Sequence, residues 1–136
     1  MSKIAVVYWS GTGNTEAMAQ SVAKGVGSDV DLFTAGEFDC AVDQYDAIAF
    51  GCPSMGSEEL EEGEFAPMFD RCLPNLAGKR IALFGSYGWG DGEWMRNWAE
   101  TCKQAGAELT CEPVICNDAP DDAAKAACEN LGKSLN

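Results

Sequence analysis

Residues 10–15 (SGTGNT) place glycines, hydroxyls and an amide side by side directly after an apolar segment. Glycine lets the backbone turn its N–H groups inward, and the polar side chains add donors at the same point. A helix that begins at Asn14 would add the partial positive charge of its N-terminus, which favours an anion. The segment lacks the lysine of a Walker loop, and Glu16 stands where the dinucleotide fingerprint has its third glycine. It therefore predicts a cradle without a cation that suits one terminal phosphate monoester, rather than an ordinary capped turn.

Two further loops carry residues that would hold a flat ring. Residues 51–60 (GCPSMGSEEL) and 85–92 (GSYGWGDG) each follow an apolar run. Trp89 stands between glycines, where no neighbouring side chain anchors it, and a flat ligand stacked on the indole would account for it. Met55 offers a soft thioether to the opposite face of the same ring. Either residue alone would more often be a surface patch or satellite core, but together they predict a ring bracketed on two sides.

The segments that must position these loops alternate between strands and helices. Apolar runs predict strands over residues 3–9, 29–34, 46–52, 79–86 and 107–116. Helical patterns occupy residues 14–27, 64–76, 92–105 and 120–135. The alternation predicts one α/β domain over residues 1–136, with a doubly wound, parallel five-stranded sheet covered by helices on both faces. Ligands of such sheets bind at the carboxyl ends of the strands, where the winding direction reverses.

The charge balance limits the partners of this chain. The formal net charge is −13, which argues against nucleic acid and anionic membranes, because both require a cationic surface. It permits attraction to proteins with basic docking patches, although solubility alone would also explain it. No apolar run approaches the roughly 20 residues that span a bilayer, and the first residues lack the layout of a signal peptide. We therefore expect a cytoplasmic protein.

The seven cysteines form no recognisable site in the sequence. No Cys-x-x-Cys pair occurs, and the chain contains no histidine, so we expect neither a metal site nor a Ser-His or Cys-His nucleophile. Scattered free thiols, kept reduced in a cytosol, are the expected state of these residues.

Three segments carry a resemblance to a known family. The stretches YWSGTGNTEAMA, GCPSMGSEELEE and LFGSYGWGDGEWM resemble the three binding loops of the short-chain flavodoxins of anaerobic bacteria, of the clostridial and Megasphaera type, and the similarity extends over essentially the whole chain. The resemblance implies strand order 2-1-3-4-5 and flavin mononucleotide (FMN) bound without a covalent bond. One departure is Pro53, which stands where some relatives have a serine.

The resemblance also implies a role for individual residues. It assigns residues 10–15 to the phosphate, Met55 to the inner face of the flavin and Trp89 to its outer face. It assigns Glu58 to the N3–H group of the ring, and a peptide switch beside the flavin to residues 56–57. The expected FMN-binding residues are Ser10, Gly11, Thr12, Gly13, Asn14, Thr15, Pro53, Ser54, Met55, Gly56, Ser57, Glu58, Ser86, Tyr87, Gly88, Trp89, Gly90 and Asn117.

The expected function is that of a low-potential one-electron carrier, which shuttles electrons between redox enzymes in place of ferredoxin. Such a protein has no catalytic residues of its own, because the flavin supplies the chemistry. Its expected partners are ferredoxin or flavodoxin reductases and oxidoreductases with basic docking surfaces, and we expect a monomer. A flavin-dependent quinone or nitro reductase would need room for a substrate over the ring, which Trp89 covers. A phosphatase would need a Cys-x5-Arg loop, and Glu58 stands six residues after Cys52.

Overall fold

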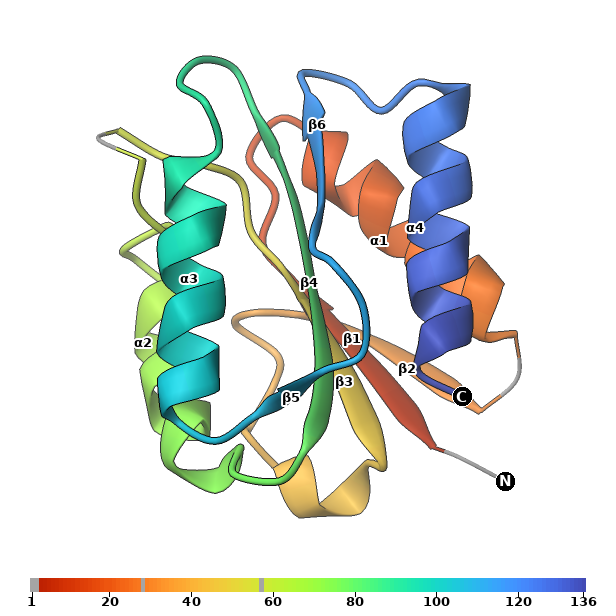
Figure 1. Ribbon diagram of the computed structural model, residues 1–136, viewed down its shortest axis with the longest axis vertical. Helices are drawn as coiled ribbons and strands as arrows, with labels where there is room; N and C mark the ends of the chain where they lie inside the picture. The colour runs from red at the N-terminus through yellow and green to blue at the C-terminus, as the bar shows by residue number, and fades with distance from the viewer. Residues whose placement is uncertain (1–2, 28, 57) are drawn as a thin grey trace.

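A single parallel sheet organises the structure, a computed structural model that describes residues 3–27, 29–56 and 58–136 (Figure 1). The strands lie in the order β2-β1-β3-β4-β5, with β6 also paired to β4, which confirms the predicted order 2-1-3-4-5. Their bounds are β1 (Ile4–Tyr8), β2 (Val30–Thr34), β3 (Ala47–Gly51), β4 (Arg80–Tyr87), β5 (Glu108–Leu109) and β6 (Val114–Asn117).

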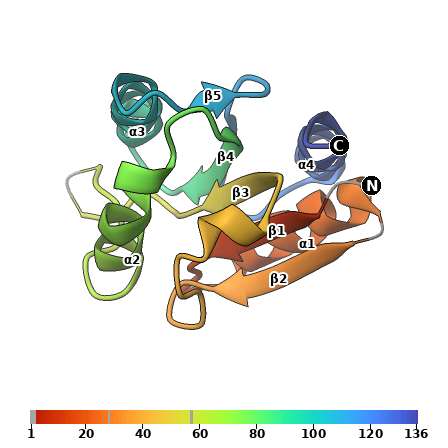
Figure 2. The same ribbon diagram turned by 90° about the horizontal axis from the view of Figure 1, so that it is seen from below.

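Four α-helices cover the two faces of the sheet (Figure 2). They are α1 (Asn14–Val26), α2 (Phe65–Cys72), α3 (Glu93–Gln104) and α4 (Asp122–Ser134). Helices α1 and α4 pack on one face with Ile4 and Val6, whereas α2 and α3 pack on the other with Ala5 and Val7. Successive side chains of a strand point to opposite faces, so strands that are apolar throughout fill both layers of core.

Two of the connections between strands contain short 3₁₀ turns. Between β2 and β3 the chain has only a short 3₁₀ turn, Val42–Gln44. The helix predicted over residues 64–76 is α-helical only as far as Cys72 and continues as the 3₁₀ turn Leu73–Asn75. Pro74 lies in that turn, where its missing N–H group cannot extend the α-helical hydrogen-bond pattern.

The last strand was predicted as one run over residues 107–116, and this is wrong in detail. It is divided into β5, which pairs with Arg80 and Ile81, and β6, which pairs with residues 84–87 of β4. The Thr110 N–H still donates to the Ile81 carbonyl at 2.9 Å, and the chain then leaves the sheet until Val114. Pro113 lies in this interval and has no N–H group to give to the sheet.

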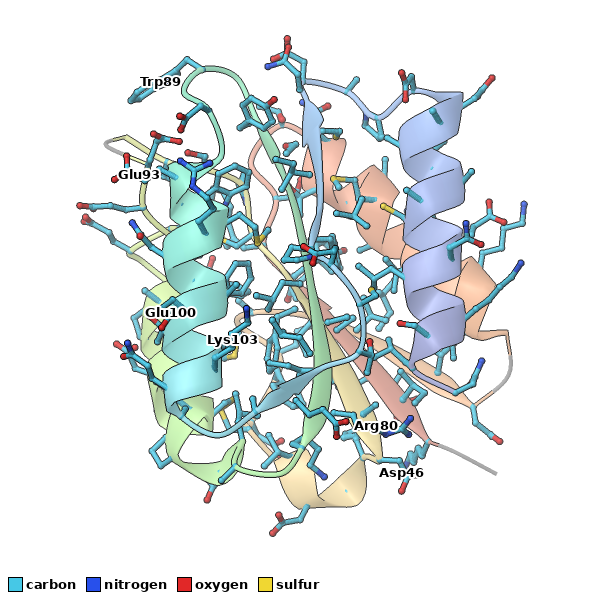
Figure 3. All side chains as sticks on the ribbon, viewed as in Figure 1. Asp46, Arg80, Trp89, Glu93, Glu100 and Lys103 are labelled. Atoms are coloured by element: carbon cyan, nitrogen blue, oxygen red, sulfur yellow. A yellow bond between two sulfur atoms is a disulfide. The ribbon has the colours of Figure 1, made fainter. Side chains whose placement is uncertain are left out.

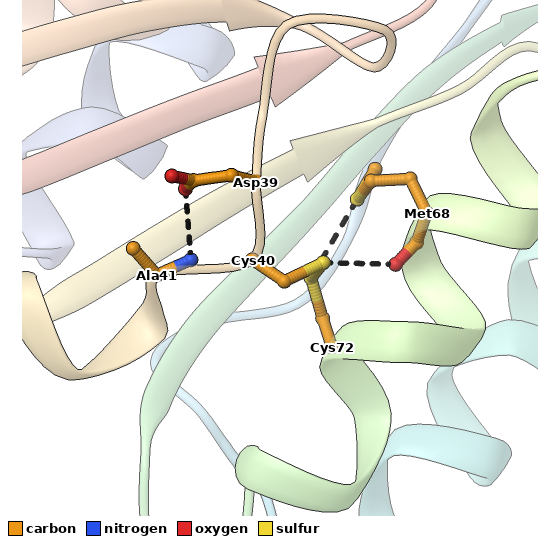
Figure 4. The surroundings of a disulfide bond; sticks show 5 residues. All are labelled: Asp39, Cys40, Ala41, Met68 and Cys72. Atoms are coloured by element: carbon orange, nitrogen blue, oxygen red, sulfur yellow. Dashed lines mark hydrogen bonds between the residues drawn. A yellow bond between two sulfur atoms is a disulfide. The ribbon is translucent and has the colours of Figure 1, made fainter.

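The prediction that all seven cysteines are free is also wrong. Cys40 and Cys72 form a disulfide, with their Cα atoms 5.2 Å apart, whereas Cys52, Cys102, Cys111, Cys116 and Cys128 are free (Figure 4). The crossover from β2 to β3 lies against α2 and brings Cys40 to the last residue of that helix. A separation of 32 residues leaves no local pattern that would reveal this pair in the sequence. No helix of the described part of the chain is long and apolar enough to cross a membrane.

Candidate functional site

The loops that follow β1, β3, β4 and β6 meet at the carboxyl edge of the sheet, at the top of Figure 1. A cavity of about 240 Å³ opens between them. Its walls are formed by Trp9, Gly11, Thr12, Asn14, Pro53, Ser54, Met55, Ser86, Tyr87, Gly88 and Asp118. The three loops singled out in the sequence therefore converge on one space, because parallel strands deliver their carboxyl ends to the same edge.

The other expected site residues lie around this cavity rather than on its wall. Ser10 and Gly13 face a neighbouring cavity of about 350 Å³, and Thr15 is buried beneath the first loop. The Asn117 side chain donates to the Tyr87 carbonyl at 3.2 Å, which fastens β6 to the end of β4. The loop after β3 contains Gly56 and Glu58, and the loop after β4 contains Trp89 and Gly90. Ser57 lies outside the described residues.

The first loop presents donors without any cation. Gly13 has φ +95° and donates its N–H to the Ser10 hydroxyl at 3.0 Å, so the chain turns sharply into α1. Within residues 10–16, which the structure describes in full, no side chain caps the α1 N-terminus. The first N–H groups of a helix lack partners inside the helix and attract an anion.

Two buried hydroxyls lie below this loop. Thr15 is 1 % exposed and Ser86 is 5 % exposed, and their oxygens are 3.4 Å apart, at the long limit of a hydrogen bond. Buried hydroxyls with one weak bond retain hydrogen-bonding capacity, which favours a polar ligand group beside them. The end of the cavity next to α1 thus suits a phosphate.

The opposite end of the site exposes two large apolar side chains. Trp89 is 62 % exposed and Met55 is 36 % exposed, and they come from the loops after β4 and β3. Figure 3 shows Trp89 at the outer tip of its loop, beyond Glu93 at the start of α3. Covering apolar groups with a ligand is favourable because it removes them from water, and aromatic faces favour flat partners. This end of the site suits a flat ring.

The loop after β3 forms a narrow turn between these ends. Met55 and Glu59 exchange backbone hydrogen bonds, each of 2.9 Å, and these bonds close the turn that contains Gly56 and Glu58. Gly56 and Glu58 both have positive φ, +48° and +57°, which suits glycine at the first position. The Glu58 carboxylate accepts the Glu93 N–H at 3.0 Å and thereby caps α3. That contact spans 35 residues and gives Glu58 a structural role that the sequence did not reveal.

Buried contacts join the loops to one another. The Ser54 N–H donates to the Ser86 carbonyl at 3.0 Å, and the Trp94 indole donates to the Cys52 carbonyl at 3.2 Å. A Cβ atom at Gly85 would overlap that carbonyl, so only glycine permits this approach. Burial raises the pKa of the Cys52 thiol to about 12, even though the Glu61 N–H bond to its sulfur acts in the opposite direction. Cys52 is therefore a neutral core residue and no nucleophile.

Two residues on the cavity wall, Trp9 and Asp118, were absent from the list of expected FMN-binding residues, although the resemblance gives the place of a fourth contact to residues 117–120. The Trp9 ring lies under Gly11, where an added Cβ atom would come within 3.0 Å of it, and borders both cavities. Asp118 has φ +57° and donates its N–H to the Tyr87 carbonyl at 2.8 Å. Trp9 lies between β1 and the first loop, and this position in the sequence could have indicated that it borders the site.

Comparison with known proteins gives a consistent result over the whole chain. The family model described as Flavodoxin matches residues 6–131. The flavodoxin of Clostridium beijerinckii is 43% identical over 134 residues, and that of Megasphaera elsdenii is 44% identical over 135 residues. Each alignment covers 96% of this chain and 96% of the relative.

Solved structures agree with the sequence comparison. The solution structure of two-electron reduced Megasphaera elsdenii flavodoxin has a TM-score of 0.89 at 43% identity and covers 97% of both chains. A flavodoxin from the domain Archaea has a TM-score of 0.85 at 29% identity and covers 98% of this chain and 95% of its own. From its sequence and its fold, this chain belongs to the flavodoxin family, whose members are FMN-binding electron carriers rather than enzymes.

Proposed function

We propose that this chain is a low-potential one-electron carrier that works in the cytoplasm in place of ferredoxin, as one monomeric domain over residues 1–136. The observation that carries the proposal is the polarity of the site: buried hydroxyls and an uncapped helix at one end, and exposed Met55 and Trp89 at the other. FMN has a phosphate at one end and a flat ring at the other, and it supplies the one-electron chemistry when bound.

The proposal gives each loop a task. Residues 10–15 hold the phosphate with N–H and hydroxyl donors, and Ser86 and Tyr87 contact the ribityl end. Met55 and Trp89 cover the two faces of the ring, and Glu58 accepts its N3–H group with the carboxylate oxygen that does not bond Glu93. Gly56 lies at the ring edge, to which the resemblance also assigns Ser57. Pro53, Ser54, Gly88, Gly90 and Asn117 complete the contacts.

The low potential follows from the charges of this edge. The loops over residues 9–13, 52–64, 87–92 and 117–121 contain no lysine or arginine. Their acidic residues are Glu58, Glu59, Glu61, Glu62, Glu64, Asp91, Asp118 and Asp121. These carboxylates and the apolar residues around the ring disfavour negative charge added at this edge. The midpoint potential of the second one-electron couple is therefore low, and the fully reduced protein is a strong reductant.

The same charges select the partners. An acidic edge around the cofactor attracts redox enzymes with basic docking surfaces, such as ferredoxin or flavodoxin reductases and oxidoreductases. At the opposing edge Lys3, Lys79 and Arg80 offset carboxylates such as Asp31 and Asp46, so that edge lacks the acidic excess of the loops and the molecule has a charge gradient along its strands. Attraction between unlike charges would turn the cofactor edge toward the partner.

Titration of the apoprotein with three flavins tests the binding site. We expect tight binding of FMN, measured by quenching of flavin fluorescence, and weaker binding of riboflavin, which lacks the phosphate. FAD is also expected to bind weakly, because its adenylate would have to leave through the turn over residues 10–15. Equal affinity for FMN and FAD would contradict the assignment of this turn to a terminal phosphate.

A redox titration of the holoprotein tests the potential. We expect the second one-electron couple to have a midpoint potential of about −400 mV, as in plant-type ferredoxins. Absorbance spectra recorded during dithionite addition give both midpoint potentials. A second couple at the potential of free FMN would show that the acidic edge does not make this protein a substitute for ferredoxin.

A further inference from the structure

The Glu61 side chain lies at the centre of a hydrogen-bond network next to the loop after β3. One carboxylate oxygen accepts the Gly63 N–H at 2.6 Å, and the other accepts the Glu64 and Phe65 N–H groups, both at 2.8 Å. Phe65 is the first residue of α2, whose first N–H groups have no partner inside the helix. Glu61 thus caps α2 from outside with charge-assisted bonds, which are the stronger kind.

The backbone N–H and carbonyl groups of Glu61 also form hydrogen bonds. Its N–H donates to the Cys52 sulfur at 3.3 Å, and its carbonyl accepts the Ala66 N–H at 2.8 Å. Cys52 is fully buried and directly follows β3. Glu61 therefore joins the end of a core strand to the start of a helix on the face of the sheet.

The described residues between Cys52 and Glu61 are 53–56 and 58–60, which we call the flavin loop. Its two ends are held together by the bond between the Glu61 N–H and the Cys52 sulfur. Within it, Met55 and Glu59 are paired by backbone bonds, and Gly56 and Glu58 lie in the turn that this pair closes. The placement of Met55 and Glu58 consequently depends on the base of the loop.

We propose that Glu61 is a positioning residue for FMN: it holds the base of the flavin loop and α2 in the arrangement that receives the ring, without contacting the ring itself. The inference rests on the proposed placement of FMN between Met55 and Trp89. Loss of the carboxylate frees three N–H groups and loosens the loop. A ligand that binds only one arrangement of a loop loses affinity in proportion to the population of that arrangement.

Glu62 provides a matched control. It is the next residue along the chain and carries the same charge at the same edge. Its side chain is exposed, and among the described residues its carboxylate accepts no hydrogen bond, unlike that of Glu61. Glu61→Gln and Glu62→Gln each remove one negative charge, so the difference between them reports on positioning rather than on charge.

The experiment compares Glu61→Gln, Glu61→Ala and Glu62→Gln with the unchanged protein. FMN dissociation constants are measured on the apoproteins, and both midpoint potentials on the holoproteins. Hydrogen exchange of the Gly63, Glu64 and Phe65 amides follows the cap directly. We expect Glu61→Ala to weaken FMN binding roughly tenfold, as when the receptive arrangement falls to about one tenth of the population. Glu61→Gln should have a smaller effect of the same sign, because one amide oxygen still accepts.

The outcomes separate the possibilities. Faster amide exchange, weaker FMN binding and changed potentials in Glu61→Gln, beyond those of Glu62→Gln, support the inference. FMN affinity and potentials equal to those of Glu62→Gln overturn it, even where exchange is faster, because Glu61 would then cap α2 only. If Glu61→Ala does not fold, Glu61→Gln decides. Failure of the unchanged apoprotein to bind FMN would contradict the proposed function instead.

Discussion

At the scale of single residues, the site depends on side chains that gain little from the fold itself. Trp89 is the most exposed of the large apolar side chains in the described chain, and Met55 is also exposed. Covering exposed apolar surface is favourable, and both residues lie on loops that border the candidate site, so we expect them to contribute to ligand binding rather than to the stability of the apoprotein. Substitutions at these positions should therefore change ligand binding and leave folding intact.

Replacement of Trp89 by alanine tests this separation. We expect Trp89→Ala to weaken FMN binding by about 1–3 kcal/mol, the free energy found when an aromatic side chain that stacks on a base is removed. The far-UV circular dichroism and the free energy of unfolding of the apoprotein should stay unchanged. Leu32→Ala, at an exposed position on β2, is the control and should not alter affinity. Collapse of the circular dichroism in Trp89→Ala would show that the indole supports the fold.

The pH dependence of stability offers a second test at this scale. Burial alone would raise the pKa of Glu61, but the Phe65, Glu64 and Gly63 N–H groups together hold it below its ordinary value of 4.5. A carboxyl whose pKa is lower in the folded state stabilises the fold above its unfolded pKa, and this contribution is lost as the pH falls through the folded pKa.

We expect the free energy of unfolding of the apoprotein to decrease below about pH 4.5, and less steeply in Glu61→Gln than in the unchanged protein. Urea titrations followed by circular dichroism at pH 3 to 7 would measure this. Glu62→Gln should retain the full slope, because the pKa of Glu61 is untouched in it. Equal slopes in all three proteins would show that the cap does not contribute to acid sensitivity.

At the scale of elements, helix contacts on the face opposite α2 and α3 depend on missing side chains. Gly25 in α1 lies against the Glu129 backbone of α4, and Gly132 in α4 lies against the Val22 backbone of α1. A Cβ atom at either position would overlap a carbonyl oxygen of the other helix. The two glycines therefore allow a close approach of backbones, and this close packing holds α4 beside α1, the helix that follows residues 10–13 of the first loop.

Gly25→Ala tests this packing. Alanine favours a helix over glycine by up to about 1 kcal/mol, but overlap with the Glu129 backbone forces the helices apart. We expect a net loss of roughly 1–3 kcal/mol in the free energy of unfolding, as for other overpacked sites. Thermal and urea unfolding measure it. A more stable variant would show that α4 moves without cost.

At the scale of the whole molecule, charge is divided along the strands. Lys24, Arg71, Lys103 and Lys133 lie in the last turns of their helices, which stabilises the helix dipoles. Helices in this fold run opposite to the strands, so these cations gather at the edge away from the candidate site. In Figure 3, Arg80 and Lys103 accordingly lie below Trp89 and Glu93. The acidic excess remains at the edge with the four binding loops.

This division makes association with redox partners dependent on salt. We expect the second-order rate of electron transfer to a partner with a basic docking surface to fall steeply as salt rises, because screening acts over about 10 Å at 0.1 M. Stopped-flow mixing of the reduced protein with such an oxidoreductase, at several sodium chloride concentrations, provides the rates. Rates that do not change with ionic strength would show that the net charge of −13 serves solubility alone.

Local sequence patterns were enough to predict the order of the elements and the loops that converge at the site. The strands over residues 3–9, 46–52 and 79–86 were continuous apolar runs, the strand over residues 29–34 was a short alternating pattern, and each of the three loops was a short stretch rich in glycines and polar side chains after one of the apolar runs. Signals of this kind are local, since burial on both faces and tight turns restrict neighbouring residues directly. Residues 10–15, 53–55 and 86–88 could therefore be assigned to one edge of the sheet without coordinates, and all but a few of them border the same cavity.

Contacts between residues that are far apart in the chain could not be predicted and became known from the folded structure. It joined Cys40 to Cys72, placed the Glu58 carboxylate on the N-terminus of α3, and brought Trp9 and Asp118 to the cavity wall. It also divided the last strand, where pairing with β4 breaks at residues 111–113. Each of these contacts depends on how elements that are remote in the chain pack together, and the residue types at either end are compatible with many other partners. Local patterns carry no information on such pairs, because the free energy that selects them arises only when the core is assembled.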